Sequence, residues 1–249
     1  MIRKLLAALI ALVGLAGVVA AALATFAGVR DRTVTTRPGP VRGVEVDVEA
    51  GRVEVVAAPA DEARIDRRRQ YIRGTPATSE TLVDGVLRVT ARCTELIALG
   101  CRVDYRIEVP EAAAVRVRTE RASVRVANIT GMVEVETRAG NVRLVGTRGP
   151  VRATTSAGNV DGFDLVAGFL DATTDAGRIR LSLADPPGRL GLRTDAGNID
   201  VALPAAPGGY RVTTETGAGR VEVDVPEDPT SARAVSATTG AGNIRIRTR

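Results

Sequence analysis

Histidine and tryptophan are absent from the 249-residue sequence, and aromatic side chains make up only 2% of it. The absence of histidine excludes Ser-His-Asp and Cys-His catalysis, as well as metal sites with histidine ligands. The sequence also contains no phosphate-binding loop and no dinucleotide-binding glycine motif. A folded body of this length must therefore build its core from valine, isoleucine, leucine and alanine, and we expect no cofactor.

Most of the chain also lacks net charge. The formal net charge is +5, and residues 1–42, which hold six basic residues and one acidic residue, account for all of it. Residues 43–249 contain 28 basic and 28 acidic residues. A protein that binds a phosphate backbone needs a basic surface, so the composition argues against a nucleic-acid partner.

One long apolar run opens the sequence. Leu5–Val29 contains 25 residues without a charge, which is longer than the ~20 residues that a transmembrane helix needs. It is also longer than the apolar region of a cleavable signal peptide, which has ~7–15 residues. We therefore predict a membrane anchor with a transmembrane helix at residues 1–30 and a linker at residues 31–42. The solenoid body described below would then lie on the extracytoplasmic side of the cell membrane, as the ectodomain of a single-pass protein.

Export of the body does not depend on whether the anchor is retained. A signal peptide cleaved at the small residues Ala22 and Ala24 is the alternative, and it also exports residues 43–249. The two cysteines, Cys93 and Cys101, bracket seven residues, and in an oxidising compartment we predict a disulfide between them. Two separate buried thiols are the alternative.

A seven-residue motif recurs through the second half of the chain, as TTSAGNV, TTDAGRI, RTDAGNI, ETGAGRV and TTGAGNI. Aligned on the glycine, the repeats are 18, 19, 20, 22 and 23 residues apart, and alanine always precedes the glycine. Valine or isoleucine always stands two positions after it. The aligned glycines are Gly140, Gly158, Gly177, Gly197, Gly219 and Gly242, and the threonines three positions before them are Thr137, Thr155, Thr174, Thr194, Thr216 and Thr239.

This spacing predicts an all-β solenoid, a parallel β-helix of two-stranded coils with about 18–23 residues per coil. Apolar residues alternate on both sides of each glycine, as in strands with one buried face. The glycine supplies a corner with positive φ, and each inward threonine can bond its counterpart in the next coil. Two further units fit with Gly51 and Ala122 at the corner, and they leave an irregular insert at about 58–110.

The outward position three residues after each corner glycine is charged. Adjacent coils in such a stack lie ~4.8 Å apart, so opposite charges would mostly face each other. Each exposed pair contributes only ~0.2–1 kcal/mol, but together the pairs favour the in-register stack. A charged ligand-binding face is the alternative function of this column, which consists of Arg143, Asp161, Arg180, Asp200, Glu222 and Arg245.

Carboxylates in adjacent coils offer one candidate for catalysis or metal binding. Asp175 and Asp195 both stand two residues before a corner glycine, so they would lie about one coil apart. Such a pair could share a proton or bind Ca²⁺, and paired carboxylates are what a glycan-cleaving enzyme requires. Two solvated corner residues are the alternative, and we expect no catalytic residue and no metal site with a complete ligand set.

The sequence resembles a bacterial family of envelope β-strand repeat proteins, the DUF4097/DUF2807-type putative adhesins. The resemblance covers residues 43–249 and is carried by an exported apolar start, VEVDVEAGRVEVV, CRVDYRIEVP and the repeated TxAGNV. It implies a β-solenoid fold, an extracytoplasmic location and, in some relatives, an association with cell-envelope stress responses. The family supplies no catalytic residues to carry over.

The predicted function is therefore a non-enzymatic, envelope-anchored module for adhesin-like binding or scaffolding. Its partner would be an envelope protein or a cell-wall polymer. The alternative is a polysaccharide lyase or hydrolase on a β-helix scaffold. The final repeat should present an open strand edge, guarded by Arg245, Arg247 and Arg249, so we expect a monomeric ectodomain whose edge suits an acidic partner strand.

Overall fold

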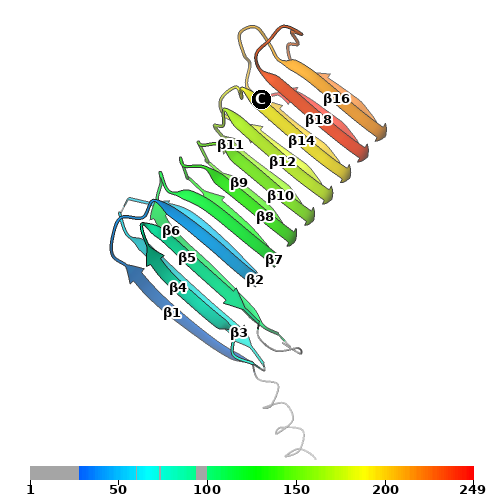
Figure 1. Cartoon of the computed structure of the whole chain (residues 1–249). Coiled ribbons are helices and arrows are strands. Elements are labelled where there is room, and N and C mark those ends of the chain that lie inside the picture. The colour runs from blue at the N-terminus through cyan, green and yellow to red at the C-terminus, as the bar shows by residue number, and fades with distance from the viewer. Residues whose placement is uncertain (1–27, 60, 73, 94–99) are drawn as a thin grey trace, which may run out of the picture.

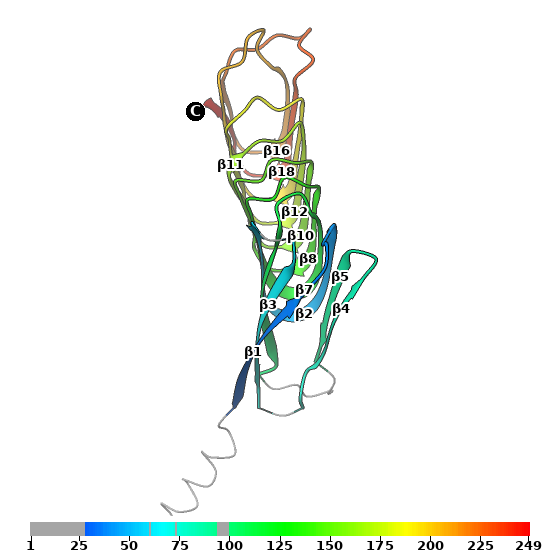
Figure 2. The same ribbon diagram turned by 90° about the vertical axis from the view of Figure 1, so that its left-hand side faces the viewer.

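The computed structural model describes residues 28–249 except residues 60, 73 and 94–99. These residues form an elongated all-β body, in which one 19-stranded sheet folds back on itself into two layers (Figures 1 and 2). No helix of the described residues is long and apolar enough to span a membrane, and residues 1–27 of the predicted anchor lie outside them. The strands are β1 (Val29–Arg37), β2 (Gly43–Ala58), β3 (Ala63–Tyr71), β4 (Ala77–Val83), β5 (Val86–Arg92), β6 (Arg102–Pro110), β7 (Ala114–Ala127), β8 (Val133–Ala139), β9 (Val142–Val145), β10 (Val151–Ala157), β11 (Val160–Leu165), β12 (Phe169–Ala176), β13 (Ile179–Leu183), β14 (Arg189–Ala196), β15 (Ile199–Leu203), β16 (Arg211–Ala218), β17 (Val221–Asp224), β18 (Ala234–Ala241) and β19 (Ile244–Thr248).

The repeats form the predicted coils, each made of two strands that meet at the Ala-Gly corner. Coils pair in parallel and in register, so that Thr155 lies beside Thr174 and Val160 beside Ile179. The residues seven before and two after the corner glycine are buried in most coils, as the alternation predicts; Leu170 and Ile179, for example, are 0% exposed. The solenoid-like core is therefore a stack of aliphatic layers.

The two earliest units depart from the predicted strand-corner-strand pattern. Gly51 and Ala122 lie side by side in the sheet, as expected for two corner positions. However, β2 runs unbroken through Gly51 and β7 runs unbroken through Ala122. Each of these coils is thus one long bent strand, whose first half belongs to one layer and whose second half belongs to the other.

The predicted insert, residues 58–110, is regular rather than irregular. It contains β3 to β6, of which β3 pairs antiparallel with β1 and β6, and β4 pairs antiparallel with β5. β5 and β6 add a coil beside the two halves of β2. The predicted linker, residues 31–42, contains most of β1. These strands build the N-terminal end of the stack, where β4 and β1 are the outermost strands of the two layers (Figure 2).

The last two coils stand in reversed order. β18 lies between β14 and β16, and β19 lies between β15 and β17 (Figure 1). The chain therefore leaves β15, builds the end coil β16–β17 first, and returns to fill the place between them. This arrangement contradicts our expectation that the final repeat presents the open edge, because β19 is paired on both sides.

Charge contributes to the reversed order through two positions, whereas a third, Arg193 beside Glu215, would be attractive in sequence order. In sequence order, Asp200 would lie beside Glu222, and Arg189 would lie beside Arg211. The observed order places Arg245 between the two acidic residues and Ala234 between the two arginines. Like charges directly opposite each other in a sheet are destabilising, so the insertion of β18–β19 turns two repulsions into neutral or attractive neighbours.

The three C-terminal arginines consequently do not guard an edge. Arg245 bonds Glu222 at 2.9 Å and Arg247 lies 3.5 Å from Asp200. Arg249 bonds the side chain of Asp164 and the backbone of Leu183. All three side chains are used within the stack, which removes the reason for expecting them to repel a second copy.

The strand order can be tested with engineered disulfides. Asp200→Cys combined with Arg245→Cys should form a disulfide, because these positions are neighbours in the β15–β19 register. Asp200→Cys combined with Glu222→Cys should stay reduced, because two strand spacings of ~4.8 Å exceed the ~7 Å Cα separation that a disulfide tolerates. Non-reducing mass spectrometry distinguishes the two, and the opposite pattern would restore the sequential order.

Candidate functional site

The recurring corner motif owes its glycine to a close approach of two backbones. A Cβ on Gly177 would collide with the carbonyl oxygen of Gly158, and one on Gly197 would collide with that of Gly177. The predicted positive φ is present at Gly177 and Gly197, but the collision also recurs at corners without it. The same collision with the neighbouring corner occurs at Gly140, Gly158, Gly219 and Gly242, and a Cβ on Gly51 would collide with the Val103 carbonyl of β6.

The inward threonines bond the backbone of the neighbouring coil rather than one another. The Thr174 hydroxyl donates to the Gly158 carbonyl at 2.9 Å, and the Thr194 hydroxyl donates to the Gly177 carbonyl at 3.0 Å. The predicted Thr-to-Thr ladder is therefore wrong for these coils. Each buried hydroxyl instead satisfies a corner carbonyl that the bend leaves free. The remaining bonds join Thr137 to Ala122, Thr155 to Gly140, Thr239 to Gly197 and Thr216 to Gly242.

One Thr-to-Thr bond does occur, and it involves a residue that the sequence reasoning missed. The Thr119 hydroxyl donates to Thr137 at 2.7 Å, and its oxygen lies 3.3 Å from the Ala122 carbonyl oxygen. Thr119 stands three residues before Ala122, the same offset as every other threonine of the series. Because the sequence alone aligns Ala122 with the corner glycines, counting three residues back from Ala122 identifies Thr119.

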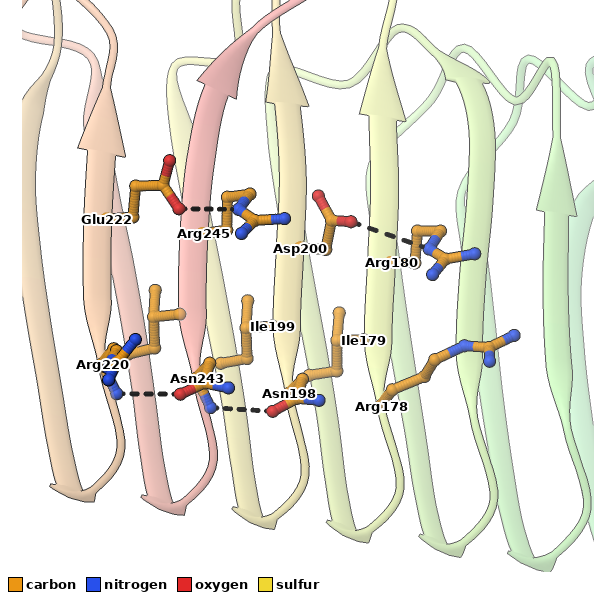
Figure 3. A pocket seen from close by; sticks show the side chains of 11 residues that line it. Arg178, Ile179, Arg180, Asn198, Ile199, Asp200, Arg220, Glu222, Asn243 and Arg245 are labelled. Atoms are coloured by element: carbon orange, nitrogen blue, oxygen red, sulfur yellow. Dashed lines mark hydrogen bonds and ion pairs between the residues drawn. The ribbon is translucent and has the colours of Figure 1, made fainter.

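The residue after the corner glycine forms a second ladder on the outside. The side-chain oxygen of each asparagine accepts the backbone N–H of the equivalent residue in the next coil. An asparagine side chain can accept this bond, whereas an arginine side chain has no acceptor. The ladder therefore stops at Arg178, whose side chain cannot accept the N–H of the next coil. The bonds run from Asn159 to Asn141, from Arg178 to Asn159, from Asn243 to Asn198 and from Arg220 to Asn243, at 2.8–3.0 Å (the last two in Figure 3).

The residues of this ladder and the charged residues two positions after them border a groove of about 420 Å³ on the outer face of β13, β15, β19 and β17 (Figure 3). Arg178 and Arg220 lie at its two ends, and the charge column runs along one side. Within that column Arg180 lies 3.9 Å from Asp200, and Arg245 bonds Glu222. The column alternates in sign from Arg143 to Glu222 once β19 takes its observed place, whereas Arg125, which precedes Arg143 in the stack, is its like-charged neighbour. The groove therefore offers mutually paired charges on an outer strand surface, not a cluster of free acids and bases.

The carboxylate pair predicted as a weak metal candidate provides too few ligands. Asp175 and Asp195 occupy the same position in adjacent coils and are exposed. Asp195 lies 3.6 Å from Arg193, and the described residues contain no group of three or more acidic, cysteine or histidine side chains that could hold a metal. Ca²⁺ takes six to eight oxygen ligands, so this pair has the geometry of two solvated corner residues.

The predicted disulfide is confirmed. Cys93 and Cys101 are bonded, with their Cα atoms 6.1 Å apart. The bond joins the end of β5 to the start of β6, which are the two strands of the first coil. Residues 94–99 between the cysteines lie outside the described residues.

A buried polar cluster lies between the layers at the N-terminal end, in a region that the sequence analysis took as irregular. Glu80 of β4 accepts from Arg67 of β3 at 2.7 Å and from the Tyr105 hydroxyl at 3.3 Å. Burial, helped by the Glu80 charge, raises the pKa of Tyr105 above its usual range. Arg67 also donates to Thr78. The aliphatic core therefore ends here in bonded polar groups, as the cap of a solenoid requires.

No protein-family model matches the chain, and no curated protein matches it. Among solved structures, a putative lipid binding protein from Parabacteroides distasonis has 10% identity and a TM-score of 0.52, over 87% of this chain and 96% of that one. A putative cell adhesion protein from Clostridium sporogenes has 12% identity and a TM-score of 0.40, over 89% and 100%. A putative adhesin from Bacteroides fragilis has 12% identity and a TM-score of 0.42, over 86% and 97%.

The likeness to the Parabacteroides distasonis structure shows a shared fold. It spans 87% of this chain and 96% of that one. The finer resemblance to the DUF4097/DUF2807-type family stays a prediction, because no family model confirms it.

Replacement of a corner glycine should destabilise the stack. Gly177→Ala should lower the free energy of unfolding by more than about 1 kcal/mol, because the new Cβ collides with the Gly158 carbonyl at a strained position. Gly168→Ala is the matched control, since its Cβ would meet nothing within 4 Å. Thermal and denaturant unfolding measure both variants, and equal losses would contradict the assignment of the corner.

Removal of one inward hydroxyl should also be costly. Thr174→Val keeps the shape of the buried side chain but removes the donor to the part-buried Gly158 carbonyl, which should cost about 1–3 kcal/mol. Thr173→Val, on the outer face of the same strand, should change stability by less than about 0.5 kcal/mol. Denaturant unfolding of the two variants separates them, and a neutral Thr174→Val would show that the bond is dispensable.

Proposed function

We propose that this chain is a non-enzymatic binding or scaffold module of the cell envelope. In this proposal the N-terminal apolar segment anchors it in the membrane as a single-pass protein, and the solenoid stands on the extracytoplasmic side. The observation that carries the proposal is the outer surface, where charged side chains of adjacent coils pair with each other in regular columns. Such a surface suits contact with an extended macromolecule.

Catalysis finds less support. A glycan-cleaving enzyme needs two carboxylates held at a defined separation around the scissile bond. In the groove, Asp200 lies between Arg180 and Arg247, and Glu222 is bonded to Arg245, so these carboxylates are held by guanidinium groups. The name of the Parabacteroides distasonis neighbour describes a binding role for that protein, which agrees with binding rather than turnover here.

The proposal is tested by binding to isolated cell envelopes. The purified full-length chain should be retained saturably by envelope preparations and should release no soluble sugar fragments from them. Release of fragments that Asp195→Asn abolishes would overturn the proposal in favour of the enzyme. Location is tested separately, because Ser156→Cys, an exposed corner residue, should react in intact cells with a thiol reagent that cannot cross the membrane.

A further inference from the structure

The end coil β16–β17 has a free backbone edge on both layers. Within the described residues, β16 pairs only with β18, and β17 pairs only with β19. The N–H of Ile244 donates to the carbonyl of Arg220. In a parallel ladder, the N–H and C=O groups of Val221 and Val223 therefore point away from β19, toward the free edge. These groups are available to another strand.

The side chains at this edge show that the stack is open here. Val221 is 43% exposed, whereas Ile199 and Ile244, its equivalents in the two preceding coils of the stack, are each 1% exposed. The carbonyl of Gly219 receives no threonine hydroxyl from the described residues, although the corner carbonyls of the two coils before it do. The opposite end of the molecule is closed by the Arg67–Glu80 cluster. The strands at that end, β1 and β4, are also edge strands with exposed valines, Val34 and Val83, so the β16–β17 end differs in that no such polar cluster ends its core.

The charges of the edge specify what would complete it. Glu222 and Asp224 point outward from β17, and on the paired side β19 places Arg245 and Arg247 in register with them. A strand added on the free side of β17 would lie beside the same two carboxylates and beside the apolar Val221 and Val223. The strand that complements them has the pattern of β19, in which apolar residues alternate with basic ones.

We propose that the β17 edge binds an extended partner segment of alternating apolar and basic residues by adding it as a further strand. This inference rests on the proposed binding function and names the chemistry of the partner. The sequence predicts a positively charged edge that binds an acidic strand, whereas the observed edge is negatively charged and suits a basic strand. Main-chain hydrogen bonds supply the affinity in such strand addition, and alternate side chains supply the specificity.

A second copy of this chain is a poorer occupant. Pairing of two β17 edges about a twofold axis would bring Glu222 and Asp224 of one copy against the same residues of the other. Like charges directly opposite each other are destabilising in a sheet. Twofold pairing of two β17 edges is therefore disfavoured, and the proposal commits to a partner segment of a different chain.

The test uses a short fluorescent peptide of alternating valine and arginine, with a valine and glutamate peptide as its charge-reversed control. Fluorescence anisotropy with the full-length chain should show saturable binding of the arginine peptide. Binding of the glutamate peptide should be at least about tenfold weaker, because two attractive pairs become repulsions. Absence of binding by the arginine peptide, or equal binding of both peptides, would overturn the proposal.

Two variants place the binding on the edge. Val223→Pro removes an N–H that faces the free edge, a position where strands tolerate proline, and it should abolish peptide binding while the melting curve shows a folded chain. If that variant does not fold, Asp224→Asn should weaken binding several-fold, because this carboxylate has no ion-pair partner within the described residues. Asp185→Asn, in the exposed loop before β14, is the matched control and should bind like the unmodified chain.

The outcome is distinguishable from failure of the proposed function. If envelopes retain the unmodified chain and Val223→Pro equally while the peptide does not bind, the edge proposal is wrong and the binding function stands. If envelopes do not retain the unmodified chain, the binding function is wrong whatever the peptide does. Peptide binding that Val223→Pro leaves unchanged would place the contact elsewhere and overturn the edge proposal alone.

Discussion

The close packing of successive corners is the constraint on which the rest of this structure depends. Each corner glycine lies so near the carbonyl of the adjacent corner that no side chain fits between them, and an inward threonine hydroxyl bonds that same carbonyl. From β8 to β19 every coil has both the glycine and the threonine at the same offset. They therefore prevent one coil from slipping along its neighbour, and the register of the whole stack follows.

The register fixed at the corners determines which side chains lie next to each other on the outer surface. Because equivalent residues lie directly beside one another, a position that is charged in every coil becomes a continuous column. The sign of each residue then matters only relative to its neighbours in space. The corners and inward rows of successive coils are nearly interchangeable, so the column charges can decide which coil stands next, and they favour β18–β19 between β14–β15 and β16–β17.

The two ends of the stack differ in the same physical terms. At the N-terminal end, charged side chains enter the space between the layers and bond one another, which ends the aliphatic core with paired polar groups. At the other end the core stops at half-exposed valines and an unpaired ladder. The two ends of the module are therefore chemically different, and the inferred partner strand belongs to the β16–β17 end.

The repeat by itself determined the strand type, the corner positions, and most of the buried threonines and valines. All of these follow from local alternation and spacing within one or two coils. Only the tertiary structure decided that β19 is inserted before β17, that the threonine hydroxyls bond carbonyls, and that residues 58–110 form a cap. These features depend on which segments become neighbours in space, and repeats that are nearly identical at their corners carry no local signal of their order.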